Sequence, residues 1–315
     1  MRALITGGAG FIGSHIAKKM VDNNIDVHII DNISTGNLEN IPFVPKSNIH
    51  IKDMTDFEYI EKLFQEFEFT YVIHLAAMVS VVETIEKPVL SNQVNIDASL
   101  NLLNCIKKYN PNIQKVIFAS SAAVYGKLDG LPKSVDSPIN PLSPYAIQKY
   151  ASEQYTKMYN DLYNIPTVSL RFFNIYGPRQ NPKSDYSGVL SIINQKFLEN
   201  QKFTFFGDGE QTRDFVYISD LVQAFWLVLN NDNVHGEVFN IGTGRQTTLN
   251  EVFDVFQKNY NYTIPYEYKE ERKGDIKYSY ADVTKLKKIG YSPQYTIKEG
   301  IREYLKYNEK TLDYK

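Results

Sequence analysis

The sequence predicts an α/β fold in which a doubly wound parallel sheet is followed by a smaller α/β domain. Short β-branched runs alternate with amphipathic stretches over the first 170 residues, and a glycine-rich turn follows the first run. After about Asn174 the alternation gives way to shorter elements. Apolar runs that alternate with helical periodicity are typical of βαβ units, whose helices cover both faces of a parallel sheet.

Five short apolar runs are predicted to be the strands of this sheet. They are Arg2–Thr6, Asp26–Ile30, Tyr71–His74, Gln114–Ala119 and Thr167–Arg171. Four stretches with apolar residues at helical spacing lie between them, and we expect helices over Phe11–Asp22, Asp56–Glu66, Val89–Tyr109 and Pro144–Tyr163. Beyond Asn174, turns are predicted at Gly207–Gly209 and Gly242–Gly244. We therefore expect a first domain over residues 1–174 and a second over 175–315, with a soft boundary because the chain is expected to cross between them.

Composition argues against several classes of protein. The chain has 315 residues, with 34 basic against 36 acidic side chains, which disfavours nucleic-acid and membrane-surface partners. No run approaches the roughly 18 apolar residues of a membrane span. A strand expected from Arg2 onward leaves no room for a signal peptide, and Cys105 stands alone, so we expect a reducing, cytoplasmic environment. The five histidines show no HExxH-like spacing, so no metal site is predicted.

A glycine pattern follows the first predicted strand and opens the first predicted helix. Gly7, Gly10 and Gly13 permit a tight turn, the approach of a pyrophosphate, and close packing of helix on strand. Asp31 ends the second strand, where a carboxylate accepts hydrogen bonds from an adenosine ribose. No Arg or Lys stands beside Asp31, so the pattern favours NAD over NADP. The alternative is a structural turn in which Asp31 caps a helix or loop.

Two further segments carry candidate chemistry. Tyr145 and Lys149 are four residues apart on one helix face, and an ammonium beside a phenol lowers a pKa that is otherwise about 10. This spacing also arises by chance, so its position at the start of a helix carries the prediction. Ser121 follows the strand predicted at Gln114–Ala119, where open α/β sheets place their chemistry, although small polar residues there also form turns.

Together these segments resemble the extended short-chain dehydrogenase/reductase family, in its sugar-nucleotide epimerase and dehydratase branch. The resemblance runs from Arg2 to about Tyr304. The segments that follow the family order and spacing are the glycine pattern, Leu75-Ala76-Ala77, Asn95, the serine segment, the Tyr/Lys pair and Leu170-Arg171-Phe172-Phe173-Asn174. It implies a Rossmann-type doubly wound parallel sheet with a smaller C-terminal α/β substrate domain, and NAD as the cofactor.

The resemblance assigns a set of residues to the cofactor. They are Gly7, Gly10, Phe11, Ile12, Gly13, Asp31, Asn32, Asp53, Met54, Leu75, Ala76, Ala77, Asn95, Tyr145, Lys149 and Phe172. Within this set, Asp53 and Met54 would border the adenine, and Leu75 and Ala76 would line the cofactor backbone. Asn95 would be structural near the active site, and we interpret Cys105 as a core residue.

The residues before Val124-Tyr125-Gly126 separate the branches of the family. The 4,6-dehydratases carry an Asp-Glu pair there, and sugar-nucleotide decarboxylases usually carry a Glu, but this chain has Ala122 and Ala123. The resemblance therefore favours oxidation at C4 followed by return of the hydride, which is 4-epimerisation. It implies Ser121, Tyr145 and Lys149 as the catalytic residues, with Tyr145 as the base.

The resemblance also implies a UDP-sugar as substrate. Asn174 would contact the diphosphate, and Arg213 and Arg272 would clamp it, because guanidinium groups suit phosphate oxygens. A surface salt bridge is the alternative for either arginine. Asp275 would accept from the ribose, while Phe206 and Phe215 would either flank the uracil or pack in the core. The full predicted set is Ser80, Ser121, Tyr145, Asn174, Val189, Phe206, Arg213, Phe215, Arg272, Asp275 and Ser279.

Ser279 carries the prediction about the sugar. In the resembling epimerases a Tyr seven positions beyond the second clamp arginine excludes N-acetyl groups, and a small residue admits them. Ser279 therefore predicts UDP-GlcNAc and UDP-GalNAc, with UDP-glucose and UDP-galactose as a further pair. Val79 argues against exclusive use of acetylated sugars, because strongly selective members tend to have Gly there. The alternative is that Ser279 is a loop residue whose size is irrelevant.

Other interpretations stay open. One is another sugar-nucleotide enzyme on the same scaffold, such as a uronate epimerase, a decarboxylase or a net dehydrogenase. Another is a non-catalytic NAD-binding regulator, against which the intact Ser121, Tyr145 and Lys149 set argues. Because the family commonly dimerises through two helices per subunit, we expect a homodimer that uses Val89–Tyr109 and Pro144–Tyr163.

Overall fold

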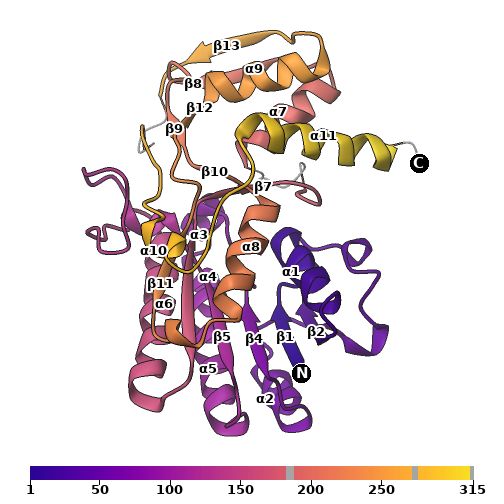
Figure 1. The fold of residues 1–315 in the computed structure, drawn as a ribbon, viewed down its shortest axis with the longest axis vertical. Coiled ribbons are helices and arrows are strands. Elements are labelled where there is room, and N and C mark those ends of the chain that lie inside the picture. Colours follow the sequence, from indigo (N-terminus) through magenta and orange to yellow (C-terminus); the bar gives the residue numbers. More distant parts are fainter. Residues whose placement is uncertain (182–187, 272–275, 313–315) are drawn as a thin grey trace. The chain divides into compact units, whose positions relative to one another are not determined.

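The computed structural model describes residues 1–181, 188–271 and 276–312, with side chains up to residue 307 (Figure 1). The chain forms two compact units. The first comprises residues 1–128, 138–172 and 224–239, and the second comprises residues 129–137, 173–223 and the described part of 240–315. The assignment of residues 1–174 to the cofactor and 175–315 to the substrate stays a prediction.

A seven-stranded sheet lies at the centre of the first unit. Its strands are β1 (Arg2–Thr6), β2 (Asp26–Asp31), β3 (Ile49–Ile51), β4 (Tyr71–His74), β5 (Lys115–Ser121), β6 (Thr167–Phe172) and β11 (Val238–Ile241). Their order is β11-β6-β5-β4-β1-β2-β3, and the neighbours from β3 to β6 pair in parallel. Strands β1 to β6 thus have the strand order of a dinucleotide-binding sheet. From β1 the sheet grows to one side through β2 and β3 and to the other side through β4, β5 and β6, so the strand order reverses between β1 and β4. The predicted fold class is confirmed.

Helices cover both faces of this sheet. They are α1 (Phe11–Val21), α2 (Phe57–Glu66), α3 (Val81–Glu86), α4 (Pro88–Asn92), α5 (Ala98–Tyr109) and α6 (Pro144–Tyr163), with short 3-10 helices at Leu38–Asn40, Lys46–Asn48 and Ala122–Tyr125. Leu4 of β1 packs in a core with Ile60 of α2 and Leu102 of α5. Side chains alternate along a strand, so Ala3 and Ile5 face the other side, where α1 packs.

The helix predicted over Val89–Tyr109 is interrupted in the structure. A π-helical turn at Gln93–Asp97 separates α4 from α5. Strand β3 and helix α3 were not predicted. β3 is only three residues long, too short for an alternating pattern to identify.

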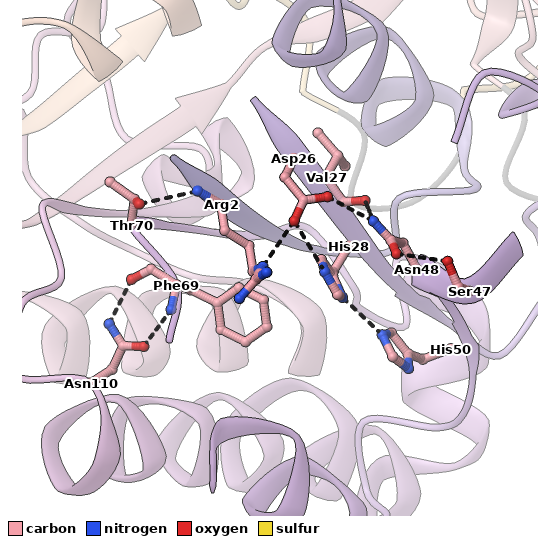
Figure 2. Close-up of polar contacts among 10 residues, drawn as sticks. All are labelled: Arg2, Asp26, Val27, His28, Ser47, Asn48, His50, Phe69, Thr70 and Asn110. Atoms are coloured by element: carbon pink, nitrogen blue, oxygen red, sulfur yellow. Dashed lines mark hydrogen bonds and ion pairs between the residues drawn. The ribbon is translucent and has the colours of Figure 1, made fainter. Parts of the chain in front are cut away.

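A polar cluster closes the amino-terminal edge of the sheet (Figure 2). Asp26 Oδ2 accepts from Arg2 Nε at 2.9 Å and Asp26 Oδ1 accepts from Asn48 Nδ2 at 2.8 Å, while His28 Nδ1 lies 3.2 Å from His50 Nε2. Burial lowers the pKa of both histidines. The cluster joins β1, β2 and β3 at their amino ends, opposite the carboxyl ends of the strands.

The second unit contains short sheets and helices. Its strands are β7 (Asn174–Tyr176), β8 (Phe203–Phe206), β9 (Thr212–Arg213), β10 (Phe215–Tyr217), β12 (Thr247–Thr248) and β13 (Tyr266–Lys269). They pair as β10–β7, β12–β9 and β13–β8. Its helices are α7 (Val189–Leu198), α9 (Leu249–Tyr260), α10 (Thr284–Lys287) and α11 (Ile297–Leu312), while α8 (Ile218–Leu229) and the 3-10 turn Asp232–Val234 lead back into the first unit. No helix in the described ranges is long and apolar enough to cross a membrane.

Candidate active site

The glycine turn between β1 and α1 has the geometry that the sequence predicted. Gly7 has φ +69°, and a Cβ there would lie 2.9 Å from the Ala76 amide nitrogen. At Gly13 a Cβ would lie 2.3 Å from the Gly7 carbonyl oxygen, so neither position accepts a larger residue. Helix α1 then begins after Gly10 without a side-chain cap among the described residues. Its first amides are therefore oriented to bind an anion such as a pyrophosphate.

Asp31 fixes the glycine turn from the end of β2. Its carboxylate accepts from the Ala9 amide at 2.9 Å and from the Ile33 amide at 2.8 Å. Burial raises the pKa of Asp31, and these backbone hydrogen bonds oppose the rise. The carboxylate thus caps the loop, as the alternative interpretation proposed. Each of its oxygens still has lone-pair capacity for a ribose hydroxyl.

The residues predicted around the adenine and the cofactor backbone follow the carboxyl ends of neighbouring strands. Asn32 Nδ2 donates to Asp53 Oδ2 at 2.7 Å, which joins the segments after β2 and β3. Met54 is a core residue with 5% exposure. The half-buried residues Leu75, Ala76 and Ala77 follow β4, Phe172 ends β6, and Phe11 and Ile12 open α1.

Ser121, Tyr145 and Lys149 meet at the carboxyl end of β5. Ser121 is the last residue of β5, and its side chain is hydrogen-bonded to the Tyr145 phenol near the start of α6. Lys149 is one turn further along α6 and is 4% exposed. Its Nζ donates to the Ala119 carbonyl at 2.9 Å and lies 6.0 Å from the centre of the Tyr145 ring.

The pKa expected for Tyr145 needs a correction. The sequence predicted that Lys149 lowers the pKa of the phenol. In the structure burial raises the pKa of Tyr145, and the hydrogen bond from Ser121 is the contribution that lowers it. Burial also lowers the pKa of Lys149 to about 7. The sequence showed the charge four residues away but not the burial that acts on the pKa of each group.

A buried hydrogen-bond network connects the glycine turn to the π-helical turn. Thr6 Oγ1 accepts from the Ala76 amide at 3.1 Å and lies 2.7 Å from His74 Nδ1. His74 Nε2 lies 2.8 Å from Ser99 Oγ, which donates to the Asn95 carbonyl at 2.7 Å. Because Ser99 Oγ donates its proton to the Asn95 carbonyl, it accepts from His74 Nε2. The proton of the imidazole is therefore assigned to Nε2, and Thr6 Oγ1 donates to Nδ1. Burial lowers the pKa of His74 to about 3, so the ring is neutral.

Helix α6 is fixed from two directions. Asn95 Nδ2 donates to Gln148 Oε1 at 2.8 Å, and Ser152 Oγ donates to the Asn95 carbonyl at 2.7 Å. On the sheet side, Arg171 Nη2 of β6 lies 2.7 Å from Glu153 Oε1. Ser120 of β5 donates to Glu153 Oε2 at 2.6 Å. Asn95 therefore joins the π-helical turn to α6 through both its side chain and its carbonyl.

Most members of these networks were missed by the sequence analysis. Gln148, Ser152 and Glu153 are buried polar residues on the inner face of an otherwise amphipathic helix. Such residues need hydrogen-bond partners, so their clustering after Tyr145 was the available signal. Ser80, predicted to contact substrate, is 2% exposed, and its side chain accepts from the Glu83 amide as the cap of α3. A capping role accounts for it.

Part of the predicted nucleotide pocket comes together in the second unit. The Asn174 amide donates to the Asp214 carbonyl at 3.0 Å, which places Asn174 beside Arg213. The Ser279 amide donates to the Thr212 carbonyl at 3.2 Å, so half-buried Ser279 also lies beside β9. Arg213 is itself half-buried. Arg272 and Asp275 lie outside the described residues.

The two predicted aromatic residues differ in their surroundings. Phe206 is half-buried at the end of β8, and its carbonyl accepts from Gln211 Nε2 at 2.8 Å. Phe215 is 7% exposed and packs edge-on against Tyr176, with 6.4 Å between the ring centres, which favours the core interpretation. Val189 is half-buried at the start of α7. Within the described residues, no cluster of three His, Cys, Asp or Glu side chains is arranged to hold a metal ion.

The family described as GDP-mannose 4,6 dehydratase matches residues 4–304. The chain belongs to this family of extended short-chain dehydrogenases/reductases. The match covers almost all of both units, so the resemblance noted in the sequence is confirmed.

Solved structures of epimerases are similar over nearly the whole chain. UDP-glucose 4-epimerase of Thermotoga maritima with UDP-glucose has a TM-score of 0.92 at 38% identity, covering 99% of this chain and 100% of that one. UDP-N-acetylglucosamine 4-epimerase of Methanobrevibacter ruminantium, in complex with UDP-N-acetylmuramic acid, has a TM-score of 0.91 at 38% identity, covering 98% of each chain. UDP-glucose 4-epimerase of Thermus thermophilus with NAD has a TM-score of 0.90 at 36% identity, covering 98% of this chain and 99% of that one.

Proposed function

We propose that the protein is an NAD-dependent 4-epimerase of a UDP-sugar. The observation that carries the proposal is the hydrogen bond between Ser121 and Tyr145 at the end of β5, with Lys149 buried beside them. Ala122 and Ala123 follow Ser121 directly and supply no further acid or base. An uncharged segment there suits a reaction that neither eliminates water nor removes a carboxyl group. The epimerases among the similar structures support the same reaction.

The first unit supplies the residues that would bind NAD. Gly7 and Gly13 leave room for the tight turn, the first amides of α1 would bind the pyrophosphate, and Asp31 would accept from the adenosine ribose. Bound NAD supplies hydride transfer at C4 of the sugar in both directions, so the reaction has no net redox change.

Tyr145 acts as the base in this proposal. Its phenolate accepts the proton of the sugar 4-hydroxyl. Ser121 donates a hydrogen bond to the phenolate oxygen and so favours the ionised form of Tyr145. Lys149, when protonated, adds a positive charge near the ring. The 4-keto sugar then turns about its diphosphate linkage, with Arg213 and Arg272 holding the phosphates. Tyr145 returns the proton when the opposite face of C4 is reduced.

Two measurements test the reaction. Purified protein is expected to release NAD on denaturation, since an epimerase retains its cofactor through both half-reactions. Tyr145→Phe is expected to keep the NAD but to lower turnover of UDP-glucose by several orders of magnitude. Tyr150→Phe, in the same helix, is the matched control. Near-normal turnover in Tyr145→Phe, or reduced NAD that accumulates with an oxidised sugar, would contradict the proposal and favour a net dehydrogenase.

We further propose that acetylated sugars are substrates. Ser279 supports this because it is small, half-buried and hydrogen-bonded through its backbone to β9, next to Arg213. The wild-type protein should interconvert UDP-GlcNAc and UDP-GalNAc as well as UDP-glucose and UDP-galactose. Ser279→Tyr should lose the acetylated pair by steric overlap and keep the plain hexoses, whereas Ser279→Ala should keep both. Turnover of UDP-GlcNAc by the Ser279→Tyr variant, measured by chromatography of the products, would contradict the proposed role of Ser279. The same assay with UDP-glucuronate tests whether the protein is a uronate epimerase.

A homodimer is proposed from exposed apolar side chains on the first unit. Val82 of α3, Val89 of α4 and Ile147 of α6 are 65%, 73% and 53% exposed. Since α3 and α4 both pack against α6, these side chains belong to neighbouring elements. A second copy of the chain would bury them. Light scattering should give twice the monomer mass, and Val89→Asp with Ile147→Asp should give monomers.

A further inference from the structure

Asp214 is a fully buried carboxylate between two predicted substrate-contacting residues, Arg213 and Phe215. It has 0% exposure. Its Oδ1 accepts from the Thr243 amide at 2.8 Å and from Thr243 Oγ1 at 2.6 Å. Its Oδ2 accepts from the Gly244 amide at 3.0 Å and from the Ala281 amide at 3.1 Å. One side chain therefore joins three separate segments of the second unit.

Two of these segments, those of Asp214 itself and of Ala281, carry residues predicted to bind the nucleotide diphosphate or the sugar. Asp214 follows Arg213 directly, and its carbonyl oxygen accepts from the Asn174 amide at 3.0 Å. Ala281 lies two residues beyond Ser279, whose amide pairs with β9 at the Thr212 carbonyl. The backbone positions of Asn174, Arg213 and Ser279 are therefore all set at or next to Asp214.

The hydrogen-bond partners of the Asp214 carboxylate fit the ionised form and oppose the burial that raises its pKa. All four partners are hydrogen-bond donors, and an ionised carboxylate is an acceptor with room for four such bonds. An amide in its place would turn an NH₂ group toward two donors on one side. The turn that supplies the donors fits closely around the carboxylate, because a Cβ on Gly242 would lie 2.7 Å from Oδ2.

We infer that Asp214 is a positioning residue for the substrate site, which sets the placement of Arg213, Asn174 and Ser279 without touching the substrate. The inference rests on the proposed function, because it takes these three residues to be the ones that bind the UDP-sugar. A misplacement of about 1 Å can cost an enzyme roughly 100-fold in function. Loss of the carboxylate should therefore act on substrate affinity and leave the cofactor residues of the first unit unchanged.

Asp220 provides a matched control in the same unit. It is 1% exposed, and its carboxylate accepts from the Gln294 amide at 2.8 Å and from the Tyr295 amide at 3.2 Å. Like Asp214, it is a buried carboxylate that accepts from backbone amides, but neither Gln294 nor Tyr295 belongs to the predicted substrate set. Asp214→Asn and Asp220→Asn should both lower the thermal midpoint. A purely structural role predicts that the two variants affect ligand binding alike.

The test measures UDP affinity by calorimetry, NAD content, and the steady-state constants with UDP-glucose. Asp214→Asn should weaken UDP binding about 10- to 100-fold and raise KM more than it lowers kcat, with NAD content unchanged. Asp220→Asn should bind UDP as the wild type does. Equal UDP affinity in the two variants would overturn the inference.

A milder substitution covers the case in which Asp214→Asn does not fold. Thr243→Val removes one of the four donors and should still weaken UDP binding while NAD content stays normal. Wild-type affinity for UDP in that variant would also overturn the inference. If the wild-type protein binds no UDP, the proposed function is refuted, and the inference with it. If the wild type binds UDP and the variants bind it equally well, only the positioning role of Asp214 is refuted.

Discussion

Replacing Arg171 with Met would remove half of a buried ion pair next to the proposed catalytic residues. The Arg171 and Glu153 side chains are 5% and 0% exposed, and two contacts join them, Nη2 to Oε1 at 2.7 Å and Nε to Oε2 at 2.9 Å. Arg171 Nη1 also donates to the Tyr125 hydroxyl at 2.9 Å. The pair links β6 to α6, one turn beyond Lys149.

The expected loss follows from what remains after the substitution. Glu153 would keep only the hydrogen bond from Ser120 at 2.6 Å, and a buried carboxylate without its cation costs about 3–5 kcal/mol of stability. When both partners become Met, no charge stays buried, and such replacements are often close to neutral. The double variant Arg171→Met with Glu153→Met should therefore be more stable than the single Arg171→Met.

Urea unfolding of the three proteins, followed by tryptophan fluorescence, measures these differences. The chain has one tryptophan, Trp226, which lies in the first unit together with the ion pair, so its signal reports on that unit. A single variant that loses less than about 1 kcal/mol would show that the pair contributes no more than an exposed one. A double variant that is as unstable as the single one would show that the loss comes from packing rather than from an uncompensated charge.

Three further predictions concern the first unit. The folded pKa of about 3 at His74 lies below the unfolded value of about 6.5, so the wild type should lose about 1.4 kcal/mol more than His74→Gln between pH 7.5 and 5.5 in urea titrations. Gly126→Ala should lower the thermal midpoint much more than Gly130→Ala. Both glycines have positive φ, but a Cβ at Gly126 would lie 1.9 Å from the carbonyl oxygen of Asn140, whereas a Cβ at Gly130 would meet no atom within 4 Å. Asp31→Asn should retain less NAD after dialysis than the wild type, since it weakens the cap of the glycine turn; equal retention counts against that role.

The parts of the candidate site whose local geometry could be predicted depend on short spacings along the chain. The glycine turn and the Tyr145 and Lys149 pair each lie within one loop or one helical turn, where sequence distance determines spatial distance. The parallel sheet was likewise visible in the alternation of apolar runs. The Glu153 and Arg171 pair is 18 residues apart and the Thr6 and His74 contact 68 residues apart. Such contacts depend on strand order, which the pattern of apolar residues does not give.

Burial was the other quantity that the sequence could not supply. The expectation for Tyr145 considered the nearby ammonium alone, but desolvation works against both charged forms, raising the pKa of the phenol and lowering that of Lys149. The π-helical turn around Asn95 was missed for a related reason. Its buried residue, Asn95, is polar, and the carbonyl of this residue accepts from the hydroxyls of Ser99 and Ser152.

The two units position their predicted site residues by separate buried networks. In the first unit, Glu153 and Asn95 fix α6 against the sheet and the preceding helix, so Tyr145 projects from an element that cannot shift independently of Ser121. In the second unit, Asp214 fixes the segments that carry Arg213 and Ser279. Buried polar groups of this kind cost stability unless all are hydrogen-bonded, and when satisfied they define one arrangement. Substitutions in the first network should therefore act on turnover, and those around Asp214 on substrate affinity.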